Sequence, residues 1–279
     1  MSYSHYGKQA EVWKHLSLCD VIAKEQPTVY VETNSAYADY HLSHSPEQEY
    51  GIYRFLEKGK STSVGESLYF QLEQEAMQEE KYIGSPGLAM SILKGAARYI
   101  FFDLDEMALQ SIHLFAGTHG LTPTVELHHQ DSIAGMMELL PLLPKTALIH
   151  IDPYAINEPG PNGYTYLDVF EQAVALDLKC ILWYGYQTLD EKDILESLIR
   201  KTCKENRYHV YSCHALTLKI IEKETFPCSP GVLGSGLLTG NLSMESRNRI
   251  DSYSSLLTTL YEGSMYKQYN GELYKEIIL

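Results

Sequence analysis

The sequence has 279 residues, with 22 Lys and Arg against 36 Asp and Glu, so its formal net charge is −14 at neutral pH. Hydrophobic residues make up 44% and charged residues 21%, which excludes a disordered chain, and no apolar stretch approaches the roughly 18 residues of a membrane helix. The acidic balance argues against a protein that coats nucleic acid by bulk charge, but it permits a nucleic-acid enzyme with a local basic site. The chain begins with a polar segment that lacks the build of a secretory signal, so a cytoplasmic protein is expected.

Strand-like runs alternate with helix-like runs along nearly the whole chain. The expected strands are rich in β-branched and aromatic residues; they are Thr28–Thr33, Tyr99–Asp103, Val125–His128, Ala147–Asp152, Cys180–Tyr184, Tyr208–Ile221 and Ser235–Asn241. Helical periodicity covers Glu11–Ala23, Glu106–Ala116, Ser132–Leu140, Tyr166–Leu176 and Glu191–Lys204, with Ser132 and Asp190 as expected N-caps. This alternation predicts an α/β fold with a parallel sheet covered on both faces.

The interval between the first two expected strands is long for a crossover. It carries helical patterns, for example Pro46–Lys58 and Glu66–Glu79, and no convincing strand. A connection of this length predicts an inserted helical subdomain. We therefore expect residues 1–42 and 95–279 to form one α/β domain, and residues 43–94 to form the insertion.

Acidic side chains follow four consecutive expected strands. They are Glu32, with Asn34 close behind it, then Asp103, Asp131 and Asp152. Turn preference alone explains one such acid, whereas four in the same place favour a polar ligand at the carboxyl ends of the strands. The pattern suits S-adenosylmethionine or a dinucleotide, and the missing G-x-G-x-x-G after the first strand counts against the dinucleotide.

The tripeptide Asp152-Pro153-Tyr154 is the most informative motif. A carboxylate and a backbone carbonyl beside proline can accept both hydrogens of an exocyclic amine, and this directs the nitrogen lone pair toward an electrophilic methyl group. A tyrosine ring can stack on a base, which contributes about 1–3 kcal/mol. The alternative is a simple turn, because Asp-Pro commonly begins one.

Other clusters favour simpler interpretations. His128 and His129 point to opposite faces of a strand, and His150 and Asp152 share a face but lack a third ligand, so no metal site is expected. The five cysteines are odd in number and form no C-x-x-C pair, which indicates reduced thiols in the core. Ser85, just before Pro86, fits a helix cap.

Several short motifs occur in an order that is fairly specific. They are Tyr3-Ser4-His5, Gly7, Glu11-Val12, Lys14-His15, Gly84-Ser85-Pro86, Asp152-Pro153-Tyr154, Trp183-Tyr184 and Gly234-Ser235-Gly236. In this order the chain resembles the 23S rRNA adenine-N6 methyltransferase family over nearly its whole length. The resemblance implies a class I methyltransferase fold, a seven-stranded sheet whose final strand is antiparallel, S-adenosylmethionine as cofactor, and RNA or DNA as substrate.

The resemblance also implies residue roles. Tyr3 and His5 match an N-terminal tail that closes over the site, and Lys14 and His15 match a pair near the cofactor and the target base. Ser85 and Asp103 match cofactor contacts, the second to the ribose, and Asp131 matches the contact to the cofactor's adenine. Asp152 matches the acid that holds the target amine, followed by Pro153 and the stacking ring of Tyr154. The expected cofactor set is completed by Glu32 and Asn34, together with His15 and Asp152.

The loop after the first strand departs from the family pattern. Where the family has D-T-H-A-G-A-G, this chain has Glu32–Ala38 with Ala36, Tyr37 and Ala38 in place of the last three residues. Two hypotheses follow: an N-methyltransferase, most simply for adenine N6 in RNA, or a non-catalytic protein of the same fold that binds a nucleotide-like ligand or a protein partner.

Overall fold

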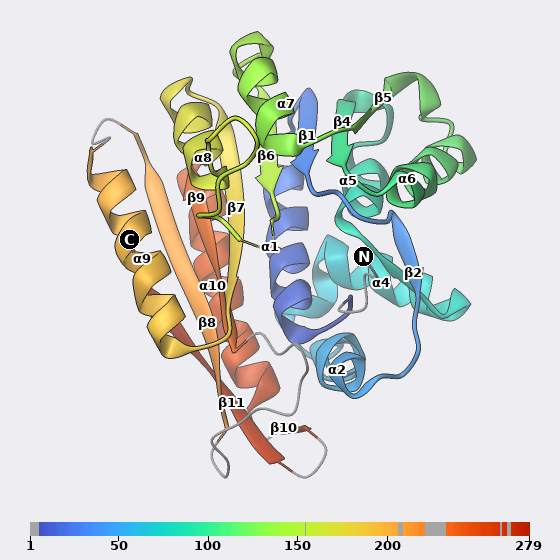
Figure 1. Cartoon of the computed structure of the whole chain (residues 1–279). Helices are drawn as coiled ribbons and strands as arrows, with labels where there is room; N and C mark the ends of the chain where they lie inside the picture. The colour runs from blue at the N-terminus through green and yellow to red at the C-terminus, as the bar shows by residue number, and fades with distance from the viewer. Residues whose placement is uncertain (1–5, 154, 206–208, 221–232, 263, 267–268) are drawn as a thin grey trace.

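Figure 1 shows the computed structural model, which describes residues 6–153, 155–205, 209–220, 233–262, 264–266 and 269–279. Within these residues, nine strands form one sheet in the order β10-β11-β8-β9-β7-β6-β1-β4-β5, and β2 and β3 form a separate pair. The strands are β1 (Val29–Thr33), β2 (Asp39–His41), β3 (Lys81–Ile83), β4 (Arg98–Asp103), β5 (Val125–His129), β6 (Ala147–Ile151), β7 (Lys179–Tyr186), β8 (Tyr211–Ile220), β9 (Gly234–Gly240), β10 (Ser264–Tyr266) and β11 (Tyr269–Ile277). The α-helices are α1 (Gln9–Glu25), α2 (Pro46–Gln48), α3 (Arg54–Gly59), α4 (Leu68–Ala76), α5 (Ser85–Leu93), α6 (Glu106–Thr118), α7 (Ser132–Leu139), α8 (Tyr166–Ala175), α9 (Leu189–Glu205) and α10 (Met244–Tyr261).

Five neighbouring strands, β5, β4, β1, β6 and β7, run parallel to one another. Every residue of β1 and β6 is buried, because helices cover both faces of the sheet. From β1 the chain proceeds outward through β4 and β5, then returns to the other side of β1 at β6. The order of the strands therefore reverses at β1, and the carboxyl ends on either side of it form the expected ligand edge.

Two hydrophobic cores lie on the two faces of the sheet (Figure 1). Helices α1, α4, α5, α6 and α10 pack on one face, and α7, α8 and α9 pack on the other. The indole nitrogen of Trp13 on α1 donates to the Ser254 hydroxyl on α10 at 3.1 Å. This bond joins the two helices that cover the centre of the first face.

The C-terminal strands are antiparallel and exceed the expected number. As expected, β9, the last strand foreseen in the sequence, runs antiparallel to both of its neighbours, β7 and β8. The prediction of seven strands is wrong, since β11 adds to β8 and β10 adds to β11, both antiparallel. In β11 charged residues such as Lys275 and Glu276 interrupt the apolar pattern, which hides the strand in the sequence.

Strand β9 carries glycines where β7 carries tyrosines. In the paired register, Tyr184 lies opposite Gly236 and Tyr186 opposite Gly234. A Cβ on Gly236 would lie 2.1 Å from the Tyr184 ring, and one on Gly234 would lie 2.4 Å from the Tyr186 hydroxyl. The tyrosine rings thus occupy the space that side chains on these glycines would need.

The segment between β1 and β4 contains strands as well as helices. The prediction that residues 43–94 lack a strand is wrong, because Lys81–Ile83 pairs with Asp39–His41. The expected helix Pro46–Lys58 is interrupted at Gly51, which has non-helical dihedrals and packs so tightly that a Cβ would lie 2.0 Å from the Gly7 carbonyl oxygen. Buried aromatic residues of this segment belong to the same core as α1, so the division into domain and insertion stays a prediction.

Candidate functional site

The loop after β1 lies between the end of β4 and the start of α5. Ser35 donates from its backbone nitrogen and from its hydroxyl to the carbonyl oxygen of Phe102, both at 3.0 Å. On the other side, the Gly84 nitrogen donates to the Ala38 carbonyl oxygen at 2.9 Å. A Cβ on Gly84 would lie 2.1 Å from the Tyr37 carbonyl oxygen, so glycine is required where α5 meets the loop.

Ala36 holds a backbone conformation that favours glycine. Its φ is +55°, as is that of Asn34. Asparagine adopts this left-handed region readily, whereas alanine does so at a cost of about 1–2 kcal/mol. The loop therefore keeps the conformation suited to the family's glycine, although the residue is now alanine.

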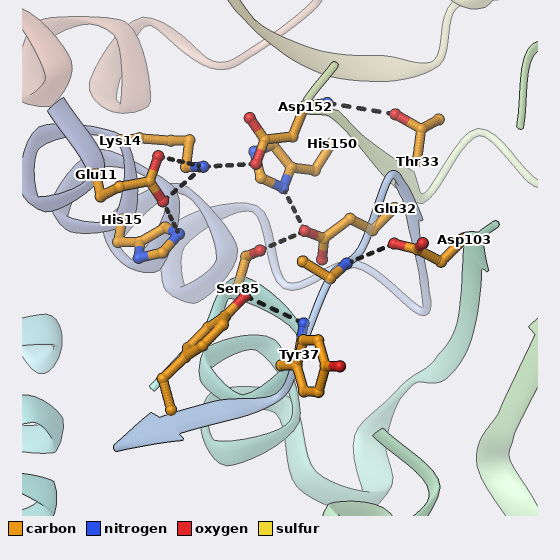
Figure 2. Close-up of polar contacts among 12 residues, drawn as sticks. Glu11, Lys14, His15, Glu32, Thr33, Tyr37, Ser85, Asp103, His150 and Asp152 are labelled. Carbon is orange, nitrogen blue, oxygen red and sulfur yellow. Dashed lines mark hydrogen bonds and ion pairs between the residues drawn. The ribbon is translucent and has the colours of Figure 1, made fainter. Parts of the chain in front are cut away.

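Asp103, at the end of β4, is held in place by two backbone N–H groups. Ala36 donates to its Oδ2 and Asp105 donates to its Oδ1, each at 2.8 Å; Figure 2 shows the Asp103 carboxylate with the first of these bonds. A carboxylate offers about four acceptor positions. The two bonds therefore fix the direction of the carboxylate, and the ribose contact that the resemblance implies stays a prediction.

Asp131, which follows β5, caps α7. Its Oδ1 accepts a hydrogen bond from the Ala134 nitrogen at 2.9 Å, so the prediction of Ser132 as the cap is wrong by one residue. The Ser132 hydroxyl instead lies 2.8 Å from the Tyr166 hydroxyl and donates to the Asn34 side-chain oxygen at 3.4 Å. These contacts bring the ends of β1 and β5 together with the start of α8.

The expected N-cap at Asp190 is also displaced. Helix α9 begins at Leu189, and the Thr188 hydroxyl accepts a hydrogen bond from the Glu191 nitrogen at 3.1 Å. A side-chain acceptor in front of the helix thus satisfies one of its first N–H groups, and that acceptor is threonine rather than aspartate.

Tyr166 is a site residue that sequence reasoning missed. Burial raises the pKa of its hydroxyl, and the carboxylates of Asp131 and Asp103 contribute in the same direction. Both carboxylates are thus close enough to act on this phenol. The one signal in the sequence is the capping box of Thr165 and Asp168, which predicts the start of α8 but not the contacts of the tyrosine.

Lys14 on α1 forms a buried ion pair with Asp152. Its Nζ lies 2.5 Å from Oδ2 of Asp152 and 3.0 Å from Oε2 of Glu11, and its side chain is 3% exposed (Figure 2). Burial alone disfavours the ammonium, but the two carboxylates outweigh it and raise the pKa of Lys14 above its ordinary value. Lys14 is therefore a fixed positive charge beside Asp152, and it also lies 5.4 Å from the centre of the Trp183 ring.

His15, the next residue, faces the inserted segment. Its Nδ1 lies 2.7 Å from the hydroxyl of Tyr82, which in turn accepts from the Tyr69 hydroxyl at 3.2 Å. Burial and the charge of Lys14 lower the pKa of His15 well below its ordinary value, so the imidazole is neutral. The structure thus connects His15 to β3 and α4, and its contact with a cofactor stays a prediction.

Glu32 and Ser85 meet in the interior, beneath the strand ends. Glu32 is fully buried; it accepts hydrogen bonds from the Tyr30 hydroxyl at 3.0 Å and from the Ser85 hydroxyl, and it lies 3.1 Å from Nδ1 of His150 (Figure 2). The N-cap of α5 is Gly84, so the interpretation of Ser85 as the cap is wrong. Direct contact of Glu32 and Ser85 with a cofactor stays a prediction.

Three expected site residues, Tyr3, His5 and Tyr154, lie outside the residues that the structure describes. The closing tail and the stacking ring therefore stay predictions. Of the motif around them, Pro153 is buried, and the Asp152 nitrogen donates to the Thr33 hydroxyl at 3.3 Å. This bond ties the turn after β6 to the end of β1.

Buried polar atoms without a hydrogen-bond partner gather around the Lys14–Asp152 pair. In the part of the chain that the structure describes, they are Nε2 of His15, Nε2 of His150 and Nε1 of Trp183. An unsatisfied buried polar atom costs about 1–3 kcal/mol. Three of them next to one ion pair indicate a polar interior that is suited to a ligand.

A separate groove of about 980 Å³ lies between α4, β3, α5 and α6. None of the expected site residues line it. It is lined by Asp39, which follows the loop after β1, and by Ser111 on α6.

Among the described residues, no three His, Cys, Asp or Glu side chains are placed to hold a metal ion. No helix in the same residues has the length and apolar character to cross a bilayer.

The chain matches no protein-family model and no curated protein sequence. Among solved structures, protein LPL1258 from Legionella pneumophila str. Philadelphia 1, a DUF519 protein, matches with a TM-score of 0.69 over 98% of each chain at 20% identity. A SAM-dependent methyltransferase from Agrobacterium tumefaciens matches with a TM-score of 0.45 at 13% identity, over 86% of this chain and 64% of the other. An O-methyltransferase from Bacillus cereus, in complex with SAH, matches with a TM-score of 0.42 at 11% identity, over 81% and 80%.

The match to LPL1258 concerns the fold. DUF519 designates the methyltransferase family that the sequence motifs resemble, so the resemblance is confirmed at this level. The predicted fold class is likewise confirmed, with two strands more than expected in the sheet. The protein has an α/β fold with a mixed sheet, and it shares that fold with a DUF519 protein along nearly its whole length.

Proposed function

We propose that the protein is an S-adenosylmethionine-dependent N-methyltransferase, with a nucleobase amine, adenine N6 in RNA, as the methyl acceptor. The observation that carries the proposal is the meeting of Asp103, Asp131 and Asp152 at one edge of the sheet, with the charge of Lys14 fixed beside the third. These carboxylates follow β4, β5 and β6, on both sides of the reversal at β1.

The residues at the strand ends fit S-adenosylmethionine. Asp103 ends β4 with its carboxylate held by backbone N–H groups, at the position where the resemblance implies a ribose contact. Asp131 uses Oδ1 for its cap, while Oδ2 can accept from an adenine amino group. The unpartnered polar atoms near Lys14 offer further contacts. When bound, the cofactor supplies a methyl group on positively charged sulfur, which a nitrogen lone pair can attack.

The chain's own residues position the acceptor. Asp152 accepts from Lys14 through Oδ2, and the carboxylate retains acceptor positions for an N–H of the target amine. The bond from the Asp152 nitrogen to Thr33 keeps the turn beside β1, where the cofactor is expected. Fixed donors and acceptors of this kind act mainly by positioning and by electrostatics, which together account for much of the rate of such transfers.

A non-catalytic binding protein is the second candidate. The observation that favours it is the loop after β1, where Ala36 replaces glycine in a left-handed conformation and Tyr37 adds a ring beside it. The acidic net charge of −14 also weighs against a large RNA surface. Under this hypothesis the strand ends bind a nucleotide-like ligand or a protein partner without chemistry.

Calorimetric titration with S-adenosylmethionine and S-adenosylhomocysteine tests the proposal. We expect micromolar binding by the wild type, and binding weaker by about 10- to 100-fold for Asp103→Asn, because a charged acceptor is lost. Asp177→Asn, which removes an exposed carboxylate paired with Lys145, is the control and should bind as the wild type does. Absence of binding by folded wild-type protein would overturn the proposal and favour the second candidate.

Transfer of a labelled methyl group to ribosomal RNA tests the acceptor. Asp152→Ala should abolish transfer while leaving the cofactor affinity within a few-fold of the wild type. Transfer at the wild-type rate in this variant would contradict the role of Asp152. If free nucleosides were labelled and RNA was not, the methyl acceptor would be a small molecule and the proposal of an RNA acceptor would be wrong.

A further inference from the structure

His150 is a fully buried histidine on β6 whose ring nitrogens have different surroundings. Its Nδ1 lies 3.1 Å from the Glu32 carboxylate and 3.3 Å from the Tyr30 hydroxyl. Its Nε2 is also buried, and within the described residues it has no hydrogen-bond partner. His150 precedes Asp152 by two residues and so shares its side of the strand, the side covered by α1.

The hydrogen bonds around Glu32 determine the tautomer of His150. Tyr30 and Ser85 both donate to the Glu32 carboxylate, which accepts and does not donate. A carboxylate oxygen 3.1 Å from Nδ1 favours the proton on that nitrogen, and we assign Nδ1 as the N–H of the ring. In the neutral imidazole, Nε2 therefore holds the lone pair.

That lone pair faces away from Glu32. Figure 2 shows the His150 ring between Glu32 and the Lys14–Asp152 pair, with contacts to Glu32 from one of its nitrogens. The charged and titratable groups around the ring are Tyr30 and Glu32 from β1, Glu11, Lys14 and His15 from α1, and Asp152 from the end of its own strand.

The other groups near Asp152 are poor proton acceptors. Lys14 keeps its proton, because Asp152 and Glu11 raise its pKa despite burial. His15 has one nitrogen engaged with Tyr82, and burial lowers its pKa well below the ordinary value. Asp152 itself is paired with the ammonium. Within the residues that the structure describes, Nε2 of His150 is then the neutral basic atom left beside this pair.

We propose that His150, oriented by Glu32, accepts the proton that the target amine releases during methyl transfer. The inference rests on the proposed function and names the donor by class, a methyl sulfonium compound. The amine nitrogen forms a bond to the methyl carbon, the carbon–sulfur bond breaks, and its electron pair remains on sulfur as a thioether. The nitrogen, now positive, loses a proton to Nε2 of His150, and water later removes that proton from the imidazolium.

Glu32 has the role of a positioning residue in this step. A buried carboxylate on the far nitrogen of an imidazole selects the tautomer and stabilises the imidazolium that forms. The proposed role also explains why Nε2 has no hydrogen-bond partner, although an unsatisfied buried acceptor lowers stability by about 1–3 kcal/mol.

The first test is independent of activity. Nitrogen NMR of labelled histidines, on the protein without added ligand, should show His150 with its proton on Nδ1 and its lone pair on Nε2. Glu32→Gln should change the populations of the two tautomers, because an amide can donate to Nδ1 as well as accept from it. A proton on Nε2 in the wild type would overturn the inference.

The second test compares His150→Gln with His214→Gln. His214 on β8 is similarly buried and also has a ring nitrogen without a hydrogen bond, so it is the matched control. His150→Gln should retain cofactor affinity but lower the single-turnover rate by about 10²-fold or more. It should also change the dependence of the single-turnover rate on pH.

The outcomes separate the inference from the function on which it rests. If the wild type transfers a methyl group and His150→Gln keeps the wild-type rate and pH profile, the inference alone fails. If His150→Gln is merely less stable, with an unchanged pH profile, His150 is structural and the inference again fails. If folded wild-type protein neither binds S-adenosylhomocysteine nor transfers a methyl group, the proposed function itself fails.

Discussion

Removal of Lys14 should destabilise the protein more than removal of its partner Asp152. The ammonium contacts two carboxylates, at 2.5 Å in Asp152 and at 3.0 Å in Glu11. Lys14→Met removes the ammonium that contacts both carboxylates, which are only 14% and 17% exposed, and breaking a buried pair in this way costs about 3–5 kcal/mol. Asp152→Asn leaves the ammonium paired with Glu11 and keeps an amide oxygen as acceptor, so its cost should be about 1–2 kcal/mol.

Urea unfolding at neutral pH measures both free energies by linear extrapolation. The double variant should lose less stability than the sum of the two single variants, because one unpaired carboxylate has gone. Arg98→Met is the control: it removes an exposed pair with Glu126 and should change the free energy of unfolding by no more than about 1 kcal/mol. Equal losses from Lys14→Met and Asp152→Asn would refute the reasoning, since the second carboxylate would then have no effect.

Two further predictions concern the loop and a buried acid. Ala36→Gly should keep or raise the melting temperature, because it removes about 1–2 kcal/mol of left-handed strain against a smaller loss of backbone entropy. Ala38 has no positive φ, so Ala38→Gly should lower the melting temperature. Calorimetric scans that show the opposite order would contradict this prediction. Glu73 is fully buried and accepts from the Ile83 nitrogen at 3.2 and 3.3 Å, and burial raises its pKa well above 4.5. Its protonated form is favoured by the fold, so its contribution is complete below the unfolded pKa and is lost as the pH rises. Glu73→Gln should therefore flatten the decline in unfolding free energy as the pH rises above about 4.5, measured by urea titration at each pH, and an unchanged slope would exclude Glu73 as its cause.

The parallel half of the fold follows from the sequence because its strands are short, apolar and regularly separated by helices. Strands β1 and β6 are buried on both faces, and Asp152 follows β6 where the sheet requires, whereas Glu32, expected after the first strand, lies within β1. The C-terminal part follows less well. Helix α10 buries Ile250, Tyr253 and Leu257 at helical spacing, but Asp and Ser residues between them weaken the pattern, and the alternation in β11 is masked by charge.

The candidate site was predictable in its positions but not in its contacts. Spacing places Asp103 and Asp152 at strand ends, and the resemblance adds Lys14, which the structure pairs with Asp152. The contact of Tyr166 with Ser132 joins residues 34 positions apart, and the contact of His150 with Glu32 joins residues on two strands. Such contacts depend on how strands pair and helices pack, and no local pattern records them.

The pairing of glycines in β9 with tyrosines in β7 changes the meaning of one motif. Gly234-Ser235-Gly236 contributes to the family resemblance, yet in the folded chain its glycines make room for the rings of Tyr186 and Tyr184. The motif is therefore explained by packing: its glycines are needed because larger side chains would not fit beside the tyrosine rings. It would persist in a relative that had lost every reactive group, so its presence in another sequence is evidence of shared packing and carries no information about chemistry.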